Sequence, residues 1–295
     1  MISARTGRLS ALKPHFWVGI SLLLAGHVLI FGRTGGGDFL RPFSDYWFAA
    51  VWFGYIFIVD AYLFARDGQS LMVSRRHVFL AMLPLSAAGW WGFEWINSFV
   101  NNWSYSRPYD LPDWYANIWS CIFFSTVIPA VWETALLVRG FRWVGNLPTV
   151  RGFVVPRGAA FALIALGAIF FVLPVMWPLY FYPLIWGFLA LILDPLNFLV
   201  RRPSMLGYWS RGDWRVPVSF YVGGLMCGIL WEFWNFWAFP KWHYHIPFVG
   251  FWHVFEMPLL GYLGYGPFAW EIFTLFWFAV GLVKRQAKAS TGLLD

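Results

Sequence analysis

The chain alternates long apolar runs with short polar segments, and this pattern predicts eight helices that cross a membrane. Each run is close to the roughly 20 residues that a helix needs to span the hydrocarbon core of a bilayer. The predicted spans cover residues 16–32, 46–65, 77–100, 114–138, 158–177, 181–200, 216–239 and 250–283. The last run is longer than one span needs and is interrupted by three glycines and Pro267, so we expect a kinked or re-entrant half-helix there.

Composition agrees with a membrane protein and excludes several other classes. The 295 residues are 60% hydrophobic and 12% charged, with a mean hydropathy of +0.59, whereas soluble domains carry about 25% charged residues. A soluble globular enzyme, a disordered tail and a nucleic-acid-binding module are therefore excluded. Cys121 and Cys227 both lie in apolar runs, so we expect neither a disulfide framework nor a thiolate metal site.

The basic residues predict how the helices are oriented. With the N-terminus in the cytoplasm, 17 of the 21 Lys and Arg residues fall in cytoplasmic segments and four on the opposite side, as the positive-inside rule requires. The first apolar run leads into Phe31-Gly32-Arg33 without a small-residue cleavage site, so we expect a retained helix and not a signal peptide. We therefore expect a multi-pass protein of the cell inner membrane with both termini cytoplasmic.

Uncommon residues recur in the same order at a nearly fixed distance, which indicates an internal duplication. The matched pairs are Glu94 with Glu232, Asn97 with Asn235, Trp103 with Trp242, Tyr105 with Tyr244, Glu133 with Glu271, and Asp60 with Asp194. We interpret the chain as two halves, residues 1–150 and 151–295, each forming a four-helix membrane repeat. The predicted fold is therefore an all-α polytopic membrane protein whose two repeats are parallel about an axis along the membrane normal.

Seven of the 14 acidic residues fall within or at the ends of the predicted spans, where an ionisable group costs at least about 2.5–3.5 kcal/mol and needs a partner or a role. They are Asp60, Glu94, Glu133, Asp194, Glu232, Glu256 and Glu271. We expect Asp60 and Asp194 to form ion pairs with Arg66 and Arg201. Glu94 and Glu232 each have an asparagine three residues later on the same helical face. They are either proton-donating acids or members of Asn–Glu pairs that hold the halves together.

Glu256 is the leading candidate for a catalytic acid because it occurs in the second half only. The matching position of the first half is Ile118. Glu271 is a further candidate, for which a structural role competes because it recurs. The second half also gains three histidines, which form a weak metal-site candidate or an interfacial loop; they are His243, His245 and His253. We expect neither a metal nor a redox cofactor.

Aromatic residues surround Glu94 and Glu232 in the sequence. The chain has 22 Trp and 32 Phe, and aromatic faces stabilise a desolvated cation by about 2 kcal/mol or more. A protonated carboxyl among such faces suits protonation-initiated cyclisation of a polyene. The same lining suits a bound pigment or quinone, and packing against lipid is the default explanation. The candidate substrate-binding residues are Asn97, Asn235, Trp231, Trp234, Trp103, Tyr105, Trp242 and Tyr244.

These motifs resemble the lycopene-cyclase-like membrane proteins, the heterodimeric or fused carotenoid cyclases of bacteria, archaea and fungi. The second half offers Trp231-Glu232, Trp242-x-Tyr244, Glu256-x-Pro258 and Glu271; the first half offers Glu94, Trp103-x-Tyr105 and Glu133. The resemblance covers about 50 residues in each half. It implies that Glu256 is the proton donor or its partner, with Glu232 and Glu94 supporting it. A single glutamate stands where the family has two, which leaves the isoprenoid substrate open.

The sequence thus favours an acid-catalysed, redox-neutral cyclase or isomerase of a carotenoid-like isoprenoid dissolved in the bilayer. Two other classes stay open. One is a non-catalytic scaffold subunit that binds pigment or membrane lipid, with partners in a larger membrane complex. The other is a proton-coupled transporter, because parallel repeats with intramembrane acids and a broken helix also suit a carrier.

Overall fold

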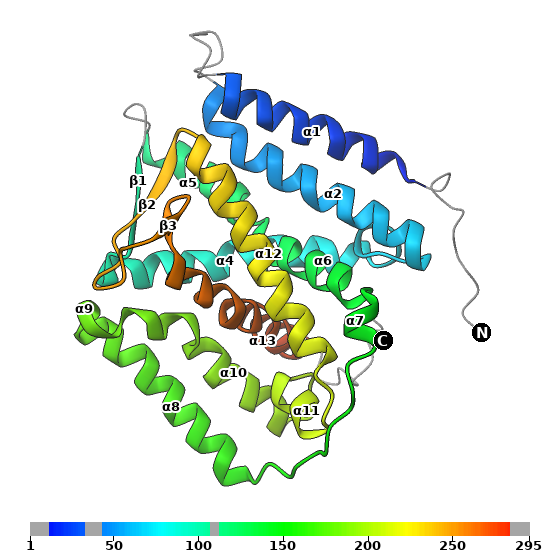
Figure 1. Cartoon of the computed structure of the whole chain (residues 1–295), viewed down its shortest axis with the longest axis vertical. Helices are drawn as coiled ribbons and strands as arrows, with labels where there is room; N and C mark the ends of the chain where they lie inside the picture. The colour runs from blue at the N-terminus through cyan, green and yellow to red at the C-terminus, as the bar shows by residue number, and fades with distance from the viewer. Residues whose placement is uncertain (1–11, 33–42, 107–111, 284–295) are drawn as a thin grey trace. The chain divides into compact units, whose positions relative to one another are not determined.

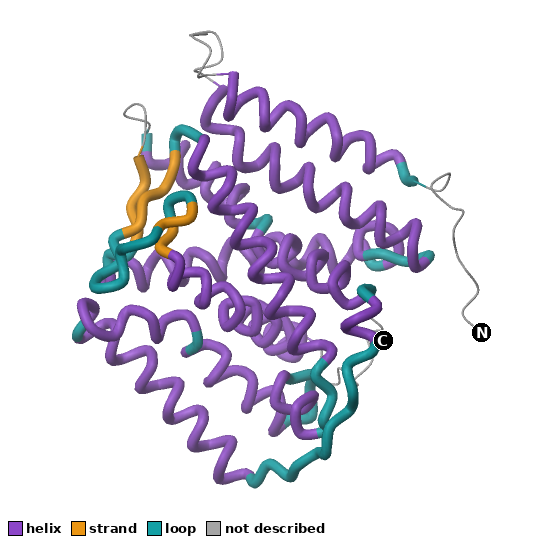
Figure 2. Tube along the Cα trace, in the orientation of Figure 1, coloured by secondary structure: helices purple, strands orange, loops and turns teal. Residues whose placement is uncertain are grey.

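The computed structural model describes residues 12–32, 43–106 and 112–283, and helices make up most of them (Figure 1). In chain order, its elements are α1 (Pro14–Phe31), α2 (Trp47–Asp67), α3 (Leu71–Ser74), α4 (Arg76–Val100), β1 (Trp103–Ser106), α5 (Asp113–Phe124), α6 (Val127–Arg139), α7 (Arg142–Gly145), α8 (Arg157–Met176), α9 (Pro178–Phe181), η4 (Tyr182–Trp186), α10 (Phe188–Leu199), α11 (Met205–Ser210), α12 (Arg215–Trp237), β2 (Lys241–Tyr244), β3 (His253–Val254), β4 (Met257–Pro258), η5 (Leu259–Gly264) and α13 (Tyr265–Val283). The strands form two small pairs, β1 with β2 and β3 with β4 (Figure 2).

Seven segments of the described chain are long and apolar enough to cross a membrane, which makes this an all-α, multi-pass membrane protein. They are Pro14–Phe31, Phe43–Asp67, Asp113–Arg139, Arg157–Met176, Pro178–Leu199, Arg215–Trp237 and Leu259–Val283. Each overlaps one of the eight predicted spans. The remaining span, 77–100, forms the 25-residue helix α4, which contains Pro84 and is less apolar than the other seven. An eight-span arrangement in parallel repeats stays a prediction.

Two predicted spans contain breaks that the apolar pattern hides. The run 114–138 is divided into α5 and α6 at Ser125 and Thr126, whose hydroxyls bond to nearby backbone carbonyls. The side chain of Ser86 bridges this break, because it donates to the carbonyl of Phe124 and accepts from the N–H of Ile128. The run 181–200 is broken at Gly187, between η4 and α10.

The last predicted span begins with a β-hairpin. Antiparallel pairing of His253 with Pro258 and of Val254 with Met257 leaves two residues in the turn. The short 3₁₀ helix η5 follows, and α13 then runs to Val283. The interruption expected in residues 250–283 is therefore a hairpin ahead of the membrane helix.

The chain packs into two compact units, each assembled from separated stretches. Unit 1 comprises Met1–Trp90, Tyr105–Glu133 and Phe233–Trp242, and unit 2 comprises Trp91–Ser104, Thr134–Glu232 and His243–Asp295. The predicted division at residue 150 is a boundary between sequence repeats. The two units are defined by packing instead, so they do not test that boundary. The two four-helix halves stay a prediction.

Helices α1 and α2 of unit 1 lie side by side (Figure 1), and glycines bring their backbones close together. A Cβ atom at Gly19 would lie 2.9 Å from the carbonyl oxygen of Gly54. A Cβ atom at Gly54 would lie 2.7 Å from the backbone nitrogen of Leu23. Small residues at such a crossing are typical of helix pairs in membranes.

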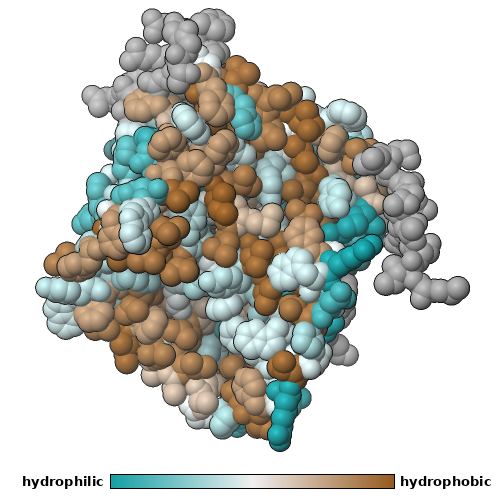
Figure 3. Space-filling model, in the orientation of Figure 1, coloured by the Kyte–Doolittle hydropathy of each residue, from teal (hydrophilic) through white to brown (hydrophobic). Residues whose placement is uncertain are grey.

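Large apolar side chains also cover outward-facing positions of the helices. Trp17 and Leu24 on α1 are 65% and 62% exposed, and Phe161 on α8 is 60% exposed. Figure 3 shows apolar residues spread over the visible face of the molecule. An exposed apolar surface of this kind suits contact with lipid.

The predicted ion pairs of Asp60 and Asp194 with arginines are wrong. Asp60 accepts a hydrogen bond from the N–H of Met72 at 2.8 Å, whereas Arg66 pairs with Asp67. Asp194 accepts from two backbone N–H groups at the start of α11, at 2.6 and 2.8 Å. A carboxylate is favourable at a helix N-terminus because it satisfies N–H groups that lack a partner within the helix.

The orientation in the membrane stays a prediction. Eight of the basic residues on which it depends lie outside the described residues: Arg5, Arg8, Arg33, Arg41, Arg107, Lys284, Arg285 and Lys288.

Candidate functional site

The most completely formed polar site of unit 2 is centred on Glu232 of α12. The Glu232 side chain is fully buried. Its Oε1 atom accepts hydrogen bonds from the hydroxyls of Tyr244 and Tyr265, both at 2.6 Å. The two hydroxyl oxygens are 3.4 Å apart. Two O–H donors therefore converge on one carboxyl oxygen.

Glycines of α12 make room for Tyr265, the first residue of α13. A Cβ atom at Gly228 would overlap the Tyr265 ring, and one at Gly224 would overlap its carbonyl oxygen. Gly224 and Gly228 are four residues apart, so they lie on one face of the helix. Sequence reasoning missed Tyr265. The signal that it missed is this glycine pair ahead of the buried acid.

The segment that carries Tyr244 is fixed to the end of α12 by Asn235. The Asn235 side chain donates to the carbonyl of Trp242 at 2.9 Å and accepts from its N–H at 2.9 Å. Tyr244 follows two residues later in β2, where side chains two apart share a face. Asn235 thus acts on the backbone, and its predicted role in substrate binding stays untested.

Glu94 has a similar environment at the end of α4. The half-buried Glu94 accepts from the indole N–H of Trp103 at 3.1 Å. Asn97 donates to the carbonyl of Trp103 at 2.8 Å and accepts from the N–H of Asn102 at 2.9 Å. Both halves of the sequence thus contain the same arrangement. It consists of an acid, an asparagine three residues later, and a backbone segment hydrogen-bonded to that asparagine.

A layer of aromatic rings in unit 2 connects the two acids. Its ring centroids lie 5.7–6.2 Å from those of their neighbours, and its members are Tyr265, Trp231, Phe268, Phe93, Trp186 and Trp103. Tyr265 donates to Glu232 at one end, and Trp103 donates to Glu94 at the other. We call these six residues the aromatic layer. Four of them, Tyr265, Phe93, Trp186 and Phe268, were not predicted as site residues.

The remaining aromatic candidates lie elsewhere. Trp234 belongs to unit 1, where its indole N–H bonds to His27 at 3.3 Å and its ring packs edge-on against Trp52. Trp242 packs on Trp47 of the same unit, with centroids 6.3 Å apart. Tyr105 is 43% exposed. None of these contacts belongs to the aromatic layer.

Glu256, the leading candidate from sequence, lies in the two-residue turn between β3 and β4. It is half-buried. The preceding residue, Phe255, has a positive φ of 58°. Its catalytic role stays a prediction.

Glu271 of α13 is fully buried and contributes to the fold. Its Oε1 atom accepts from the N–H of Leu189 at 2.9 Å. Leu189 lies in the first turn of α10, immediately after the break at Gly187. The contact satisfies one of the N–H groups left unpaired at a helix start, so it favours the structural interpretation of this acid.

The three histidines do not form a metal centre in the part of the chain that the structure describes. No group of three or more His, Cys, Asp or Glu side chains suited to a metal ion occurs there. His245 is exposed and its ring contacts the hydroxyl of Ser104 at 2.8 Å. His253 is exposed on β3, and His243 is half-buried on β2.

Comparison with known proteins gives no match: no family model, no curated protein and no solved structure is similar to this chain.

Proposed function

We propose that this protein is a membrane-embedded, acid-catalysed cyclase or isomerase of a carotenoid-like isoprenoid. The observation that carries the proposal is the buried carboxyl of Glu232, which accepts two tyrosine hydroxyls at 2.6 Å beside the aromatic layer. The apolar helices support a substrate that is dissolved in the bilayer.

Glu232 is the proton donor in this proposal. It transfers its proton to a carbon–carbon double bond, which leaves a carbocation on the isoprenoid and a carboxylate on Glu232. Hydrogen bonds to an ionised acceptor are about twice as strong as bonds to a neutral one. The hydroxyls of Tyr244 and Tyr265 therefore stabilise the transferred state more than the starting state, which lowers the barrier.

The aromatic layer stabilises the cation. The faces of Trp231, Trp186 and Phe268 provide cation–π attraction without supplying a nucleophile that would trap the intermediate. A carboxylate then removes a proton from a neighbouring carbon and restores a double bond. One proton is added and one is removed, so the reaction is redox-neutral and needs no cofactor.

We assign the donor role to Glu232 in preference to Glu256. Glu232 is fully buried among hydrogen-bond donors, whereas Glu256 lies in a hairpin turn. Glu94 is the second acid that borders the aromatic layer, through Trp103, and it is the candidate base. We also propose that the chain forms two parallel four-helix repeats and that both termini are cytoplasmic.

The test compares the organic extracts of detergent-purified wild-type protein and of Glu232→Gln by mass spectrometry and absorption spectroscopy. Both are expressed in a host that makes carotenoid precursors. Glu→Gln keeps the shape and a hydrogen-bond acceptor but removes the acidic proton. We expect product with the wild type and precursor with Glu232→Gln. The control, Asp113→Asn, alters an exposed acid at the start of α5 and should behave as the wild type.

Other outcomes identify the competing classes. Equal product from the wild type and Glu232→Gln, with loss in Glu256→Gln, would transfer the donor role to Glu256. A bound pigment that is unchanged in every Glu→Gln variant would contradict catalysis and indicate a binding subunit. An extract that holds only phospholipid, together with proton-dependent uptake of solute by proteoliposomes, would indicate a transporter.

A further inference from the structure

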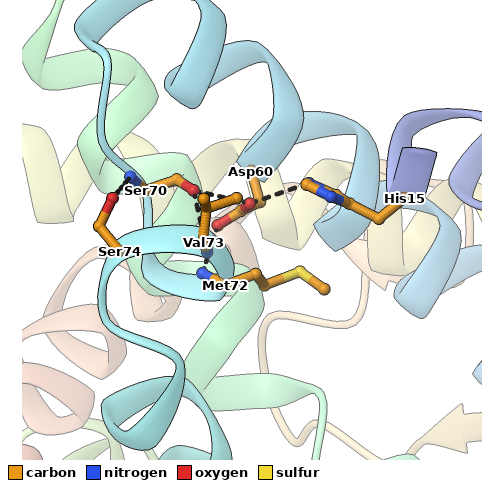
Figure 4. Close-up of polar contacts among 6 residues, drawn as sticks. All are labelled: His15, Asp60, Ser70, Met72, Val73 and Ser74. Atoms are coloured by element: carbon orange, nitrogen blue, oxygen red, sulfur yellow. Dashed lines mark hydrogen bonds and ion pairs between the residues drawn. The ribbon is translucent and has the colours of Figure 1, made fainter. Parts of the chain in front are cut away.

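Unit 1 contains a second group of buried titratable residues, centred on Asp60 of α2 (Figure 4). The Asp60 side chain is fully buried. Its Oδ2 atom accepts from the hydroxyl of Ser70 at 2.9 Å and lies 3.0 Å from Nε2 of His15. Its Oδ1 atom accepts from the N–H of Met72 at 2.8 Å. One carboxyl oxygen is thus in contact with an imidazole nitrogen.

His15 connects this cluster to the surface of the unit. It is the second residue of α1, and its side chain is 17% exposed. The neighbouring cations have other contacts, since Lys13 lies over the Phe64 ring and Arg66 pairs with Asp67. His15 is therefore the basic side chain that contacts Asp60 in the described structure.

Glu133 of α6 is a second buried acid of unit 1. Its side chain is fully buried, and neither carboxyl oxygen makes a hydrogen bond of ordinary geometry within the described residues. The Asp60 carboxyl acts on it electrostatically. A buried carboxylate without donors is far more costly than a buried neutral acid, so burial favours the protonated form of Glu133.

In the second half of the sequence, the residues that match Asp60 and Glu133 make their contacts without a histidine. Asp194 uses both oxygens on backbone N–H groups, and Glu271 accepts from the N–H of Leu189. Helix α8, which opens that half as α1 opens the first, begins with Arg157-Gly158 where α1 has Pro14-His15. The second half therefore folds without a histidine at this position and without a buried acid that lacks donors. Structural need alone does not explain His15 and Glu133 in the first half.

We propose that His15, Asp60 and Glu133 form a proton-uptake path whose terminal binding site is Glu133. Glu133 first releases its own proton outward through Asp60 and His15. His15 then takes a proton from water at the exposed edge of its ring and transfers one from Nε2 to Oδ2 of Asp60, and Asp60 returns one to Glu133. Each step moves one proton, and His15 is recharged from water. Chains of Asp, Glu and His within membranes are typical proton relays. The proposal does not rest on the proposed cyclase function, because the aromatic layer contains none of these residues.

The test measures hydrogen–deuterium exchange at Glu133 by infrared spectroscopy of the full-length protein in lipid nanodiscs. A protonated carboxyl has a carbonyl band that shifts when its proton is replaced by deuterium. We expect the wild-type band to contain a component from Glu133 that is lost in Glu133→Gln. The matched control is Glu271→Gln, which should keep the band and its exchange rate.

The role of His15 is tested by the rate of that shift. A positioned proton-transfer group contributes about 100-fold or more, so His15→Ala should slow the exchange about 100-fold while leaving the band in place. Added imidazole should restore the rate, which it would not do if His15 only supported the packing of α1. Exchange at the wild-type rate in His15→Ala would overturn the proposal.

A labelling experiment on the wild type covers the case in which Glu133→Gln fails to fold. Dicyclohexylcarbodiimide reacts with protonated carboxyls in apolar surroundings, and peptide mass spectrometry locates the adduct. We expect the adduct on Glu133. Labelling of other acids with Glu133 unmodified would overturn the proposal.

Discussion

Replacement of Glu271 by leucine removes a helix cap, and the first half of the chain offers a matched control. Helix α10 starts at Phe188 inside an apolar run, so its first N–H groups have no partner within the helix. Glu271 accepts one of them, from Leu189, at 2.9 Å. The corresponding helix of the first half, α2, is continuous from Trp47 to Asp67. Glu133, the counterpart of Glu271, caps no such break.

The size of the effect follows from these contacts. Loss of an N-cap acceptor costs about 0.5–2 kcal/mol, and hydrogen bonds between membrane helices average about 0.6 kcal/mol with a maximum of about 1.7. Leucine fills a similar volume, so Glu271→Leu should lower the free energy of unfolding by about 1–2 kcal/mol. Glu133→Leu replaces a buried acid without donors by an apolar side chain, a change that is often neutral or stabilising.

The assay is equilibrium unfolding in mixed micelles of increasing dodecyl sulfate content, followed by tryptophan fluorescence and far-UV circular dichroism. Glu271→Gln retains an oxygen acceptor for the N–H of Leu189 and should recover most of the lost stability. Equal losses in Glu271→Leu and Glu133→Leu, or a larger loss in the latter, would refute the capping role of Glu271.

Three further predictions follow from individual contacts. Gly54→Ala should lower the free energy of unfolding by about 1–3 kcal/mol, because its Cβ would lie 2.7 Å from a backbone nitrogen of α1; unchanged stability in the micelle assay would contradict this crossing. Tyr265→Phe should lower product formation while leaving stability nearly unchanged, because one donor to the Glu232 carboxylate is lost; full activity in the extract assay would argue against that role. The side-chain hydrogen bond from Arg215 holds the pKa of Asp213 below its ordinary value, so the stability that this pair contributes is present above about pH 3.9 and is lost as the pH falls through the lower, folded-state pKa. Acidification should therefore lower the thermal unfolding midpoint less in Asp213→Asn than in the wild type, and equal shifts would contradict it.

The positions of the helices were largely predictable because apolar runs of the right length leave few alternatives in a membrane. The predicted span 158–177 differs by one residue at each end from α8, Arg157–Met176. The break at Gly187 and the hairpin at residues 253–258 were not predicted. They lie inside apolar runs, where a turn depends on tertiary partners such as Glu271 and leaves no polar gap in the pattern.

The candidate site was predictable where its members are close in sequence. Glu232 and Tyr244 are separated by one helix end and a short strand, and the structure joins them by a 2.6 Å hydrogen bond. Tyr265, Trp186 and Phe268 come from distant segments, so their convergence depends on helix packing that periodicity does not specify. The pairing of Asp60 with Arg66 was wrong because sequence proximity favoured a cation, whereas a helix start and His15 supply the observed contacts.

The acid role of Glu232 is tested most directly by the organic extract of the Glu232→Gln variant. The protein must remain folded, as judged by its circular dichroism and its unfolding curve. The account predicts that the extracted isoprenoid changes from product to precursor and that Asp113→Asn retains the product. The same product from Glu232→Gln as from the wild type would contradict the central claim.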